Sequence, residues 1–244
     1  MRIVLLFLSF CYGLSLFGQV TYLHCGRLIT ATDEMTIIVE DDKIKSVERG
    51  YVKPIAGAAV IDLKDKTVMP GLIDLHVHIE SQSSRTRYLE VFTKEKADVA
   101  LRATTYCDKT LAAGFTTVRD LGGSGVNVSL RNAIRDGHIN GPRIVTAEKA
   151  IGTTGGHADP TNGYRSDLMG DPGPDDGVIN SPEDAYKAVR ARYKKGADCI
   201  KITATGGVLS VAKDGSGPQF TQEEVNAIVA AANDYNMTTA AHAH

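Results

Sequence analysis

The sequence predicts an α/β protein whose main part is a (β/α) barrel with a small β unit before it. From Pro70 onward, strand-like and helix-like segments alternate, which indicates a parallel sheet with right-handed crossovers. The long loops rich in Gly, Asp and Pro follow strands, as they do on the active-site face of a barrel. An open doubly wound sheet is the alternative, but no dinucleotide fingerprint follows any strand, so we favour the barrel.

Composition sets broad limits on size and partners. A chain of 244 residues can form one large domain or one and a half ordinary ones, and 43% hydrophobic with 23% charged residues is typical of globular proteins. The net charge of -2 and the pI near 6.4 argue against nucleic acid or an anionic membrane as a partner. No segment after the N-terminus is long and apolar enough to span a bilayer.

Residues 1–18 have the pattern of a secretory signal peptide. Arg2 precedes an apolar run, and Gly18 supplies a small residue at its end. We expect an exported protein, periplasmic or extracellular; the alternative is a buried strand or helix of the mature chain. Cleavage would remove Cys11 and leave three scattered cysteines, which do not resemble a disulfide framework.

Residues 19–68 are predicted to form part of a small β-sandwich domain. Residues 36–39 and 44–47 are strand-like, and the Asp41-Asp42 pair lies where a hairpin turn is expected. Such a unit is too small to hold a core alone.

From residue 69 the barrel elements follow in order. Strands are predicted at Leu72–Val77, Thr116–Arg119, Arg143–Ala147, Cys199–Ile202 and Thr238–His242. Amphipathic helical segments are predicted near 86–113, 125–136, 182–195 and 222–235. The loops at 148–180 and 203–220 are long enough to indicate function.

Local signals mark several helix ends. Ser181 and Thr221 are N-cap hydroxyls, each followed by an acidic residue at the third helical position. Gly114, Gly137 and Gly196 lie where a left-handed residue is needed before the next strand.

The strand from Leu72 to Val77 leads into a His-x-His pair. His76 and His78 are two residues apart, so on a strand their imidazoles project from the same face. Imidazole is a common ligand of zinc and similar metals. His-x-His also occurs in ordinary surface strands, but the Pro-Gly turn and apolar lead-in favour a metal site.

Two further strands end in candidate ligands. Lys201 is flanked by β-branched residues, and a charged lysine is costly to bury without a partner. Near two dications its pKa would fall, and the free amine can add carbon dioxide to become a carbamate. His242 closes the last predicted strand and is a better ligand candidate than His244 because it lies further inside the strand. The Gly-rich stretch 206–218 lacks the Lys-Ser/Thr of a phosphate loop and is interpreted as an active-site loop.

Together these segments resemble the amidohydrolase superfamily. Pro-Gly-Leu-Ile-Asp-Leu-His-Val-His at 70–78, the Lys201 strand and the His242-Ala243-His244 strand carry the resemblance. The runs at 116–123, 155–159 and 201–207 are similar to the prolidase-like branch, which includes Xaa-Pro dipeptidases and relatives of imidazolonepropionase. The similarity extends from about residue 22 to the last residue.

The resemblance implies a metal-dependent hydrolase of C–N bonds on a (β/α)8 barrel with a small β-sandwich beside it. By analogy, His76 and His78 hold one metal ion, carboxylated Lys201 bridges to a second, and His242 binds the second. Two zinc ions roughly 3.5–4 Å apart would activate a hydroxide that attacks an amide carbon. Dipeptides such as Xaa-Pro, or N-acyl amino acids, are the expected substrates, and a family-like homo-oligomer fits as well.

Other residues receive roles of different kinds. His157, in the long third loop, is the candidate for a catalytic contact to the substrate, with a structural loop role as the alternative. Tyr164 and Arg165, in the same loop, are candidates for binding a substrate carboxylate. Arg119 and Asp120 are interpreted as a structural pair, and Glu80 as a poor substitute for the family's catalytic acid.

The resemblance also implies that only five of eight barrel strands are present, in a barrel region at 69–244. We expect this polypeptide alone to be inactive and prone to aggregation, because an incomplete barrel exposes strand edges and apolar surface. Two other functions stay open: a mononuclear cyclic-amide hydrolase or deaminase of the imidazolonepropionase type, and a non-catalytic relic of the fold.

Overall fold

The structure is a computed structural model, and it describes residues 19–29, 32–207, 210–211 and 217–243. The chain divides into two compact units, Met1–Pro70 and Gly71–His244. The predicted signal peptide at 1–18 and His244 lie outside the described residues, so export stays a prediction. None of the described helices combines the length and apolar character needed to cross a bilayer.

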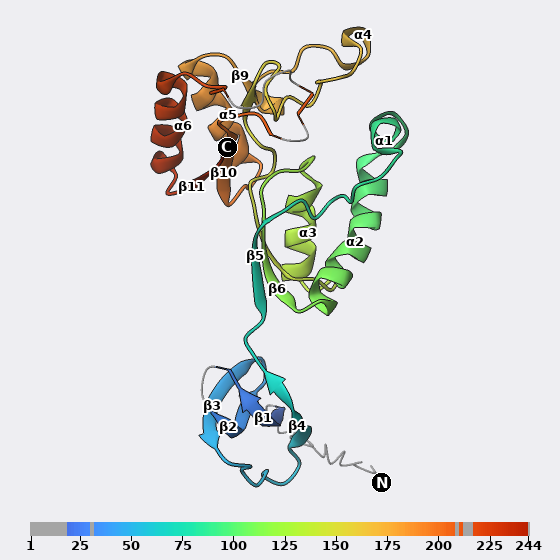
Figure 1. Cartoon of the computed structure of the whole chain (residues 1–244), viewed down its shortest axis with the longest axis vertical. Coiled ribbons are helices and arrows are strands. Elements are labelled where there is room, and N and C mark those ends of the chain that lie inside the picture. The colour runs from blue at the N-terminus through green and yellow to red at the C-terminus, as the bar shows by residue number, and fades with distance from the viewer. Residues whose placement is uncertain (1–18, 30–31, 208–209, 212–216, 244) are drawn as a thin grey trace, which may run out of the picture. The chain divides into compact units, whose positions relative to one another are not determined.

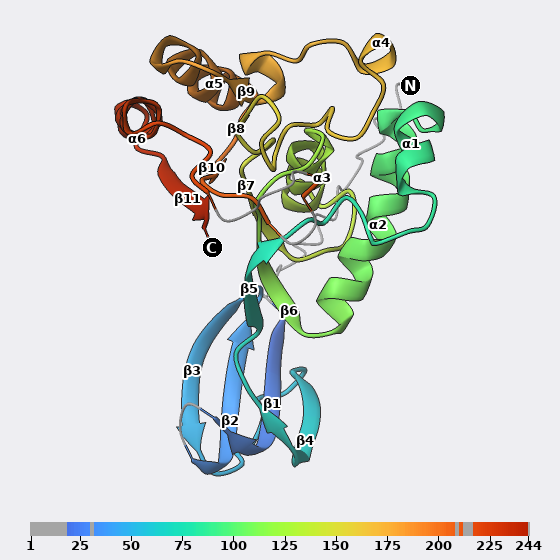
Figure 2. The ribbon, with the colours of Figure 1, turned by 45° about the horizontal axis from the view of Figure 1, so that its top comes forward.

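The first unit is a four-stranded sheet in the order β3-β2-β1-β4 (Figure 2). Its strands are β1 (Val20–Leu28), β2 (Asp33–Glu40), β3 (Lys43–Arg49) and β4 (Ala59–Val68). β2 pairs antiparallel with β1 and β3, whereas β4 runs parallel to β1. The β2–β3 hairpin turns at Asp41, whose φ of 55° lies in the left-handed region that Asp tolerates. Cys25, Leu28, Met35 and Ile37 form its core.

The second unit alternates strands and helices (Figure 1). Its main elements are β5 (Leu72–Val77), α1 (Arg87–Thr93), α2 (Lys96–Ala112), β6 (Phe115–Asp120), α3 (Val126–Arg135), β7 (Arg143–Thr146), α5 (Pro182–Lys194), β10 (Cys199–Thr203), α6 (Gln222–Asp234) and β11 (Thr238–His242). β5, β6 and β7 form one parallel sheet, and β10 and β11 form another. The two sheets are joined where Asp198 N donates to Thr146 O at 2.7 Å. This arc of parallel strands is part of a (β/α) barrel, as the sequence predicted.

Two hydrophobic clusters hold this unit together. Helices α2 and α3 pack side by side against β6 and β7 around the buried residues Cys107, Val118, Leu130 and Ile144 (Figure 1). Helices α5 and α6 pack on β10 through a second cluster that contains Val189, Ile200 and Ile228. Because both helix pairs cover the outside of the strands, the carboxyl ends of the strands are left for a site.

The structure corrects two details of the predicted elements. The single amphipathic segment near 86–113 is two helices, because Lys94 is extended and the carboxylate of Glu95 caps α2 in a reciprocal pair with Asp98. The loop at 148–180 is not structureless, since it contains β8 (Gly152–Thr153), α4 (Ser166–Met169), a short 3-10 helix η1 (Pro174–Asp176) and β9 (Val178–Ile179).

Candidate metal centre

The predicted ligands lie at the carboxyl ends of three strands of the second unit. His76 and His78 come from the end of β5, and their ring centroids are 5.4 Å apart in an edge-to-face arrangement. Lys201 lies within β10, and His242 closes β11. Lys201 pairs with Ala240 in the parallel register, and Thr203 pairs with His242. The fold therefore places an amine and an imidazole on adjacent strands.

Electrostatic effects show that these groups share one environment. Partial burial is the main cause that lowers the pKa of the His76 imidazole, and the charge of Lys201 is the second. Smaller contributions in the same direction come from His78, His242 and Arg119. Each of the other predicted ligands therefore lies near enough to His76 for its charge to affect that imidazole.

Lys201 is a buried lysine. It is only 3% exposed, and none of the ion pairs in the described part of the chain includes it. Burial, followed by the charge of Arg119, lowers the pKa of its ammonium group. Thr203 lies two residues along the strand on the same face, and its buried hydroxyl has no hydrogen-bond partner in the described part of the chain. The Lys201 amine and the Thr203 hydroxyl thus lie buried on one face of β10, without an ion pair or hydrogen bond to the described side chains.

The histidine rings are oriented by backbone carbonyls. His78 Nδ1 donates to Gly122 O at 2.7 Å, and His242 Nε2 donates to Gly206 O at 3.0 Å. A carbonyl can only accept, so each of these nitrogens carries a proton. This leaves Nε2 of His78 as the nitrogen suited to bind a metal.

His157 lies beside His242, as a residue of the same site would. Their ring centroids are 4.8 Å apart, and His157 Nδ1 is 2.6 Å from Ser210 Oγ. Gly207 lies against both rings, because a Cβ at this position would be 2.9 Å from His157 Cε1 and 3.0 Å from His242 Nε2. Only glycine fits at this position without displacing a ring.

Tyr164 and Arg165 lie in a different environment from the histidines. Tyr164 packs on the rings of Tyr88 and Phe92 of α1, at centroid distances of 5.5 and 5.6 Å. Arg165 is exposed and makes an ion pair with Asp167 at 2.6 Å. The guanidinium therefore already has a carboxylate partner within the protein.

Arg119 and Asp120 do not pair with each other, which corrects the sequence prediction. Neighbouring residues on a strand point to opposite faces. Arg119 Nε donates to Leu75 O at 2.8 Å, and the charge of Arg119 reaches Lys201 and His76. Asp120 is buried on the other face. The strand alternation of 115–120 indicates that the two side chains point to opposite faces, but it does not say which face is buried.

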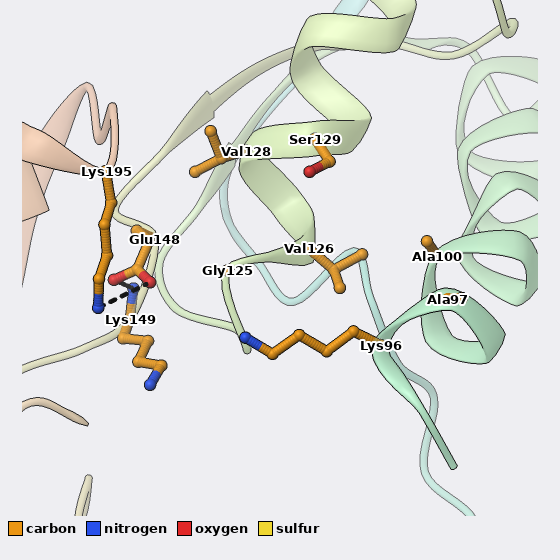
Figure 3. A pocket seen from close by; sticks show the side chains of 10 residues that line it. All are labelled: Lys96, Ala97, Ala100, Gly125, Val126, Val128, Ser129, Glu148, Lys149 and Lys195. Atoms are coloured by element: carbon orange, nitrogen blue, oxygen red, sulfur yellow. Dashed lines mark hydrogen bonds and ion pairs between the residues drawn. The ribbon is translucent and has the colours of Figure 1, made fainter. Parts of the chain in front are cut away.

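Two observations limit the site. Across the described ranges, no three His, Cys, Asp or Glu side chains lie close enough together to form a metal cluster. A cavity of about 540 Å³ opens instead beside the start of α3, with Lys96, Lys149 and Lys195 around it (Figure 3). None of the predicted site residues lines that cavity.

The chain is similar to several known proteins. Residues 67–244 match the amidohydrolase family. The chain belongs to that family. Ochratoxinase from Aspergillus niger is 29% identical over 245 residues, covering 93% of this chain and 51% of that protein. This chain therefore spans about half the length of the curated relatives it matches.

Solved structures of the same family extend the comparison. The structure of a Xaa-Pro dipeptidase with methionine bound in its active site has 47% identity and a TM-score of 0.85, covering 93% of this chain and 57% of that one. A prolidase in complex with N-methylphosphonate-L-proline has 32% identity and a TM-score of 0.79, covering 93% and 56%. The predicted resemblance to the prolidase-like branch of the amidohydrolases is confirmed.

Proposed function

We propose that the protein is a metal-dependent amidohydrolase that cleaves C–N bonds in small amides, such as Xaa-Pro dipeptides or N-acyl amino acids. The observation that carries the proposal is the convergence of His76, Lys201 and His242 from three strand ends on one electrostatic environment. Family membership and the similarity to a Xaa-Pro dipeptidase support the reaction class.

The residues present fit a divalent metal. Imidazole nitrogens from His76, His78 and His242 are suitable donors for zinc. Lys201, buried without a carboxylate partner among the described residues, would contribute an anionic oxygen once carbon dioxide has added to its amine. When bound, the metal would polarise the scissile carbonyl and lower the pKa of a water molecule.

The remaining side chains serve the substrate. His157, whose Nδ1 lies beside Ser210 Oγ and whose ring lies tilted beside that of His242, would donate a hydrogen bond to the carbonyl oxygen as negative charge develops on it. Tyr164 and Arg165 are the candidates for the substrate carboxylate, and Arg165 would have to exchange Asp167 for that group.

The test combines metal content with turnover of a defined substrate panel. The purified full-length gene product is assayed with Xaa-Pro dipeptides, N-acyl amino acids and a cyclic amide, before and after chelation, and its metal content is measured by elemental analysis. Lys201→Ala should lose bound metal and activity, whereas Lys187→Ala, at an exposed position on α5, should keep both. Two metal ions per chain in the wild type support the binuclear centre.

Other outcomes separate the alternatives. A single metal ion that survives Lys201→Ala, together with turnover of the cyclic amide only, would establish the mononuclear reaction and overturn the proposal. A folded protein without metal and without turnover would establish a non-catalytic relic of the fold.

Export is part of the same proposal. The pattern at 1–18 supports a cleaved signal, so the mature protein should begin near Gln19. N-terminal sequencing of protein recovered from the secreted or periplasmic fraction tests this, and an intact Met1 there would contradict it.

A further inference from the structure

A buried polar network lies directly behind the end of β5, and the proposed reaction does not use it. Its members are Asp120 at the end of β6, Asn127 in the first turn of α3 and Glu80 just after the His-x-His pair. Asp120 and Asn127 are 0% exposed, and Glu80 is 6% exposed. Ionisable groups buried this deeply need several hydrogen bonds to compensate for lost hydration.

The carboxylate of Asp120 holds the backbone on both sides of the His78 ring. Its Oδ2 accepts from Ile79 N at 2.7 Å, and Ile79 directly follows His78 in the chain. Its Oδ1 accepts from Gly122 N at 3.2 Å, and Gly122 O is the acceptor for His78 Nδ1 at 2.7 Å. One side chain thus bonds to the main chain beside the imidazole and to the residue whose carbonyl the imidazole binds. The peptide unit of that carbonyl is also held where Gly123 N donates to Glu148 O at 2.8 Å.

The other members keep this carboxylate in place. Asn127 Nδ2 donates to Asp120 Oδ1 at 2.8 Å and to Glu148 O at 2.9 Å. Glu80 accepts from the backbone amides of Ser124 and Asn127 at 2.7 and 2.6 Å, which satisfies donors at the start of α3.

Glycines allow the chain to wrap around these carboxylates. Gly122 has a φ of 133°, and a Cβ at Gly123 would lie 2.5 Å from Glu80 Oε1. The loop between β6 and α3 is therefore shaped around the network and cannot easily move the Gly122 carbonyl.

We propose that Asp120, supported by Asn127 and Glu80, is a positioning residue that fixes the tautomer and ring orientation of His78 for metal binding. The proposal rests on the proposed metal centre and adds the residue that orients one of its ligands. With Nδ1 protonated and held by Gly122 O, the lone pair of His78 lies on Nε2. Partners of this kind raise metal affinity without touching the metal.

Asp120→Asn is the test variant because it keeps the shape and changes one acceptor into a donor. Whichever way the new amide turns, its NH₂ group faces an N–H of Ile79, or those of Gly122 and Asn127. Cobalt and zinc affinities are measured at pH 7.5 by competition with a chromophoric chelator. We expect Asp120→Asn to weaken binding by about 10- to 100-fold.

The second readout is the tautomer of His78 without metal. In the wild type, the ¹⁵N shifts of His78, assigned with His78→Ala, should show a proton on Nδ1. In Asp120→Asn, both tautomers should be populated. Loss of a negative charge alone would weaken metal binding but would leave the tautomer unchanged, so an unchanged tautomer would overturn positioning.

Thr36→Val serves as the control for loss of a buried hydroxyl. Thr36 is buried in β2 of the first unit, and its hydroxyl donates to Gly50 O at 2.7 Å and accepts from Val52 N at 2.9 Å. This variant should lose stability yet keep the wild-type metal affinity and tautomer. If Asp120→Asn does not fold, Asn127→Ala, which removes one of the three hydrogen bonds to Asp120, should show a smaller change in the same two readouts.

The outcomes separate this inference from the proposed function. If the wild type binds metal, His78→Ala does not, and Asp120→Asn binds as the wild type does, the inference is wrong while the metal centre stands. If the wild type binds no metal, the metal centre is wrong, and the tautomer comparison alone then confirms or overturns the role of Asp120.

Discussion

The ion pair between Glu148 and Arg192 gives the sharpest prediction for stability. Arg192 is 0% exposed, and its Nη1 lies 2.8 Å from Glu148 Oε2 on a side chain that is 4% exposed. The guanidinium also donates to the carbonyls of Asp175 and Pro174, and its Nε has no partner in the described part of the chain. Burial lowers the pKa of Arg192, which marks the cost of keeping this cation out of water.

Glu148→Gln removes the carboxylate that pairs with that cation and leaves only the weaker influence of Asp175 and Asp176, neither of which forms an ion pair with it. Removing one partner of a buried pair costs about 3–5 kcal/mol, because the other charge is left uncompensated. Lys195 Nζ lies 3.9 Å from Glu148 Oε1 and is also a cation, so it cannot compensate the charge of Arg192 in this variant. For a unit of this size, the loss corresponds to a fall in Tm of about 6–20 °C.

The assay is urea unfolding followed by circular dichroism, with an exposed pair as control. Arg135 and Asp136 also form an ion pair at 2.9 Å, but both side chains are largely in water. Asp136→Asn should therefore cost less than about 1 kcal/mol. The double variant Glu148→Gln/Arg192→Met should recover part of the loss, because it removes the unpaired cation. A cost below about 1 kcal/mol for Glu148→Gln would refute the reasoning.

Three further predictions follow from single groups. Burial raises the pKa of Asp120 to about 6, so between about pH 4 and 6 the folded state holds a proton that the unfolded chain has released. The free energy of unfolding should therefore fall by up to about 3 kcal/mol as the pH rises through that window, and Asp120→Asn should abolish the trend in urea titrations. Gly207→Ala should displace the His157 and His242 rings and lower kcat/KM about 10- to 100-fold. The accompanying loss of stability, about 1–3 kcal/mol, is too small to explain that fall in kcat/KM. Kinetics equal to those of the wild type would argue against this site. In a Cys11→Ser variant, the remaining cysteines Cys25, Cys107 and Cys199 are all buried. No thiol should therefore react with a disulfide reagent at pH 8 until urea is added, and labelling before urea would contradict this packing.

Features encoded by neighbouring residues were predicted well. Ser181 Oγ accepts from Asp184 N, and Thr221 forms a reciprocal cap with Glu224, as their spacing indicated. Gly114, Gly137 and Gly196 all have positive φ values, as expected for residues that end helices. The strands Leu72–Val77 and Thr238–His242 have the predicted bounds. Each of these signals acts within a few residues, so the sequence alone was sufficient.

Features that join distant residues were missed. Asp120 bonds to the amide of Ile79, 41 residues away, and Glu80 bonds to Asn127, 47 residues away. A carboxylate that accepts backbone amides carries no sequence pattern, because any residue type supplies the donor. The capping of α2 by Glu95 was missed for another reason, since glutamate is not among the usual N-cap residues. The roles of Arg119 and Asp120 required knowing which face of β6 is buried.

Three histidines of the second unit share one arrangement, and it explains why loops, and not the strands alone, orient these rings. His78, at the end of β5, is held by Gly122 in the loop after β6. His242, at the end of β11, is held by Gly206 in the loop after β10, and His157 is held by Ser210 in the same loop. Each ring is thus oriented by a loop that follows a different strand from its own. Because a parallel sheet brings the ends of its strands together, such cross-bracing fixes the rings before any ligand arrives. Substitutions in these loops should therefore change metal affinity and turnover more than stability, even where the altered residue touches neither metal nor substrate.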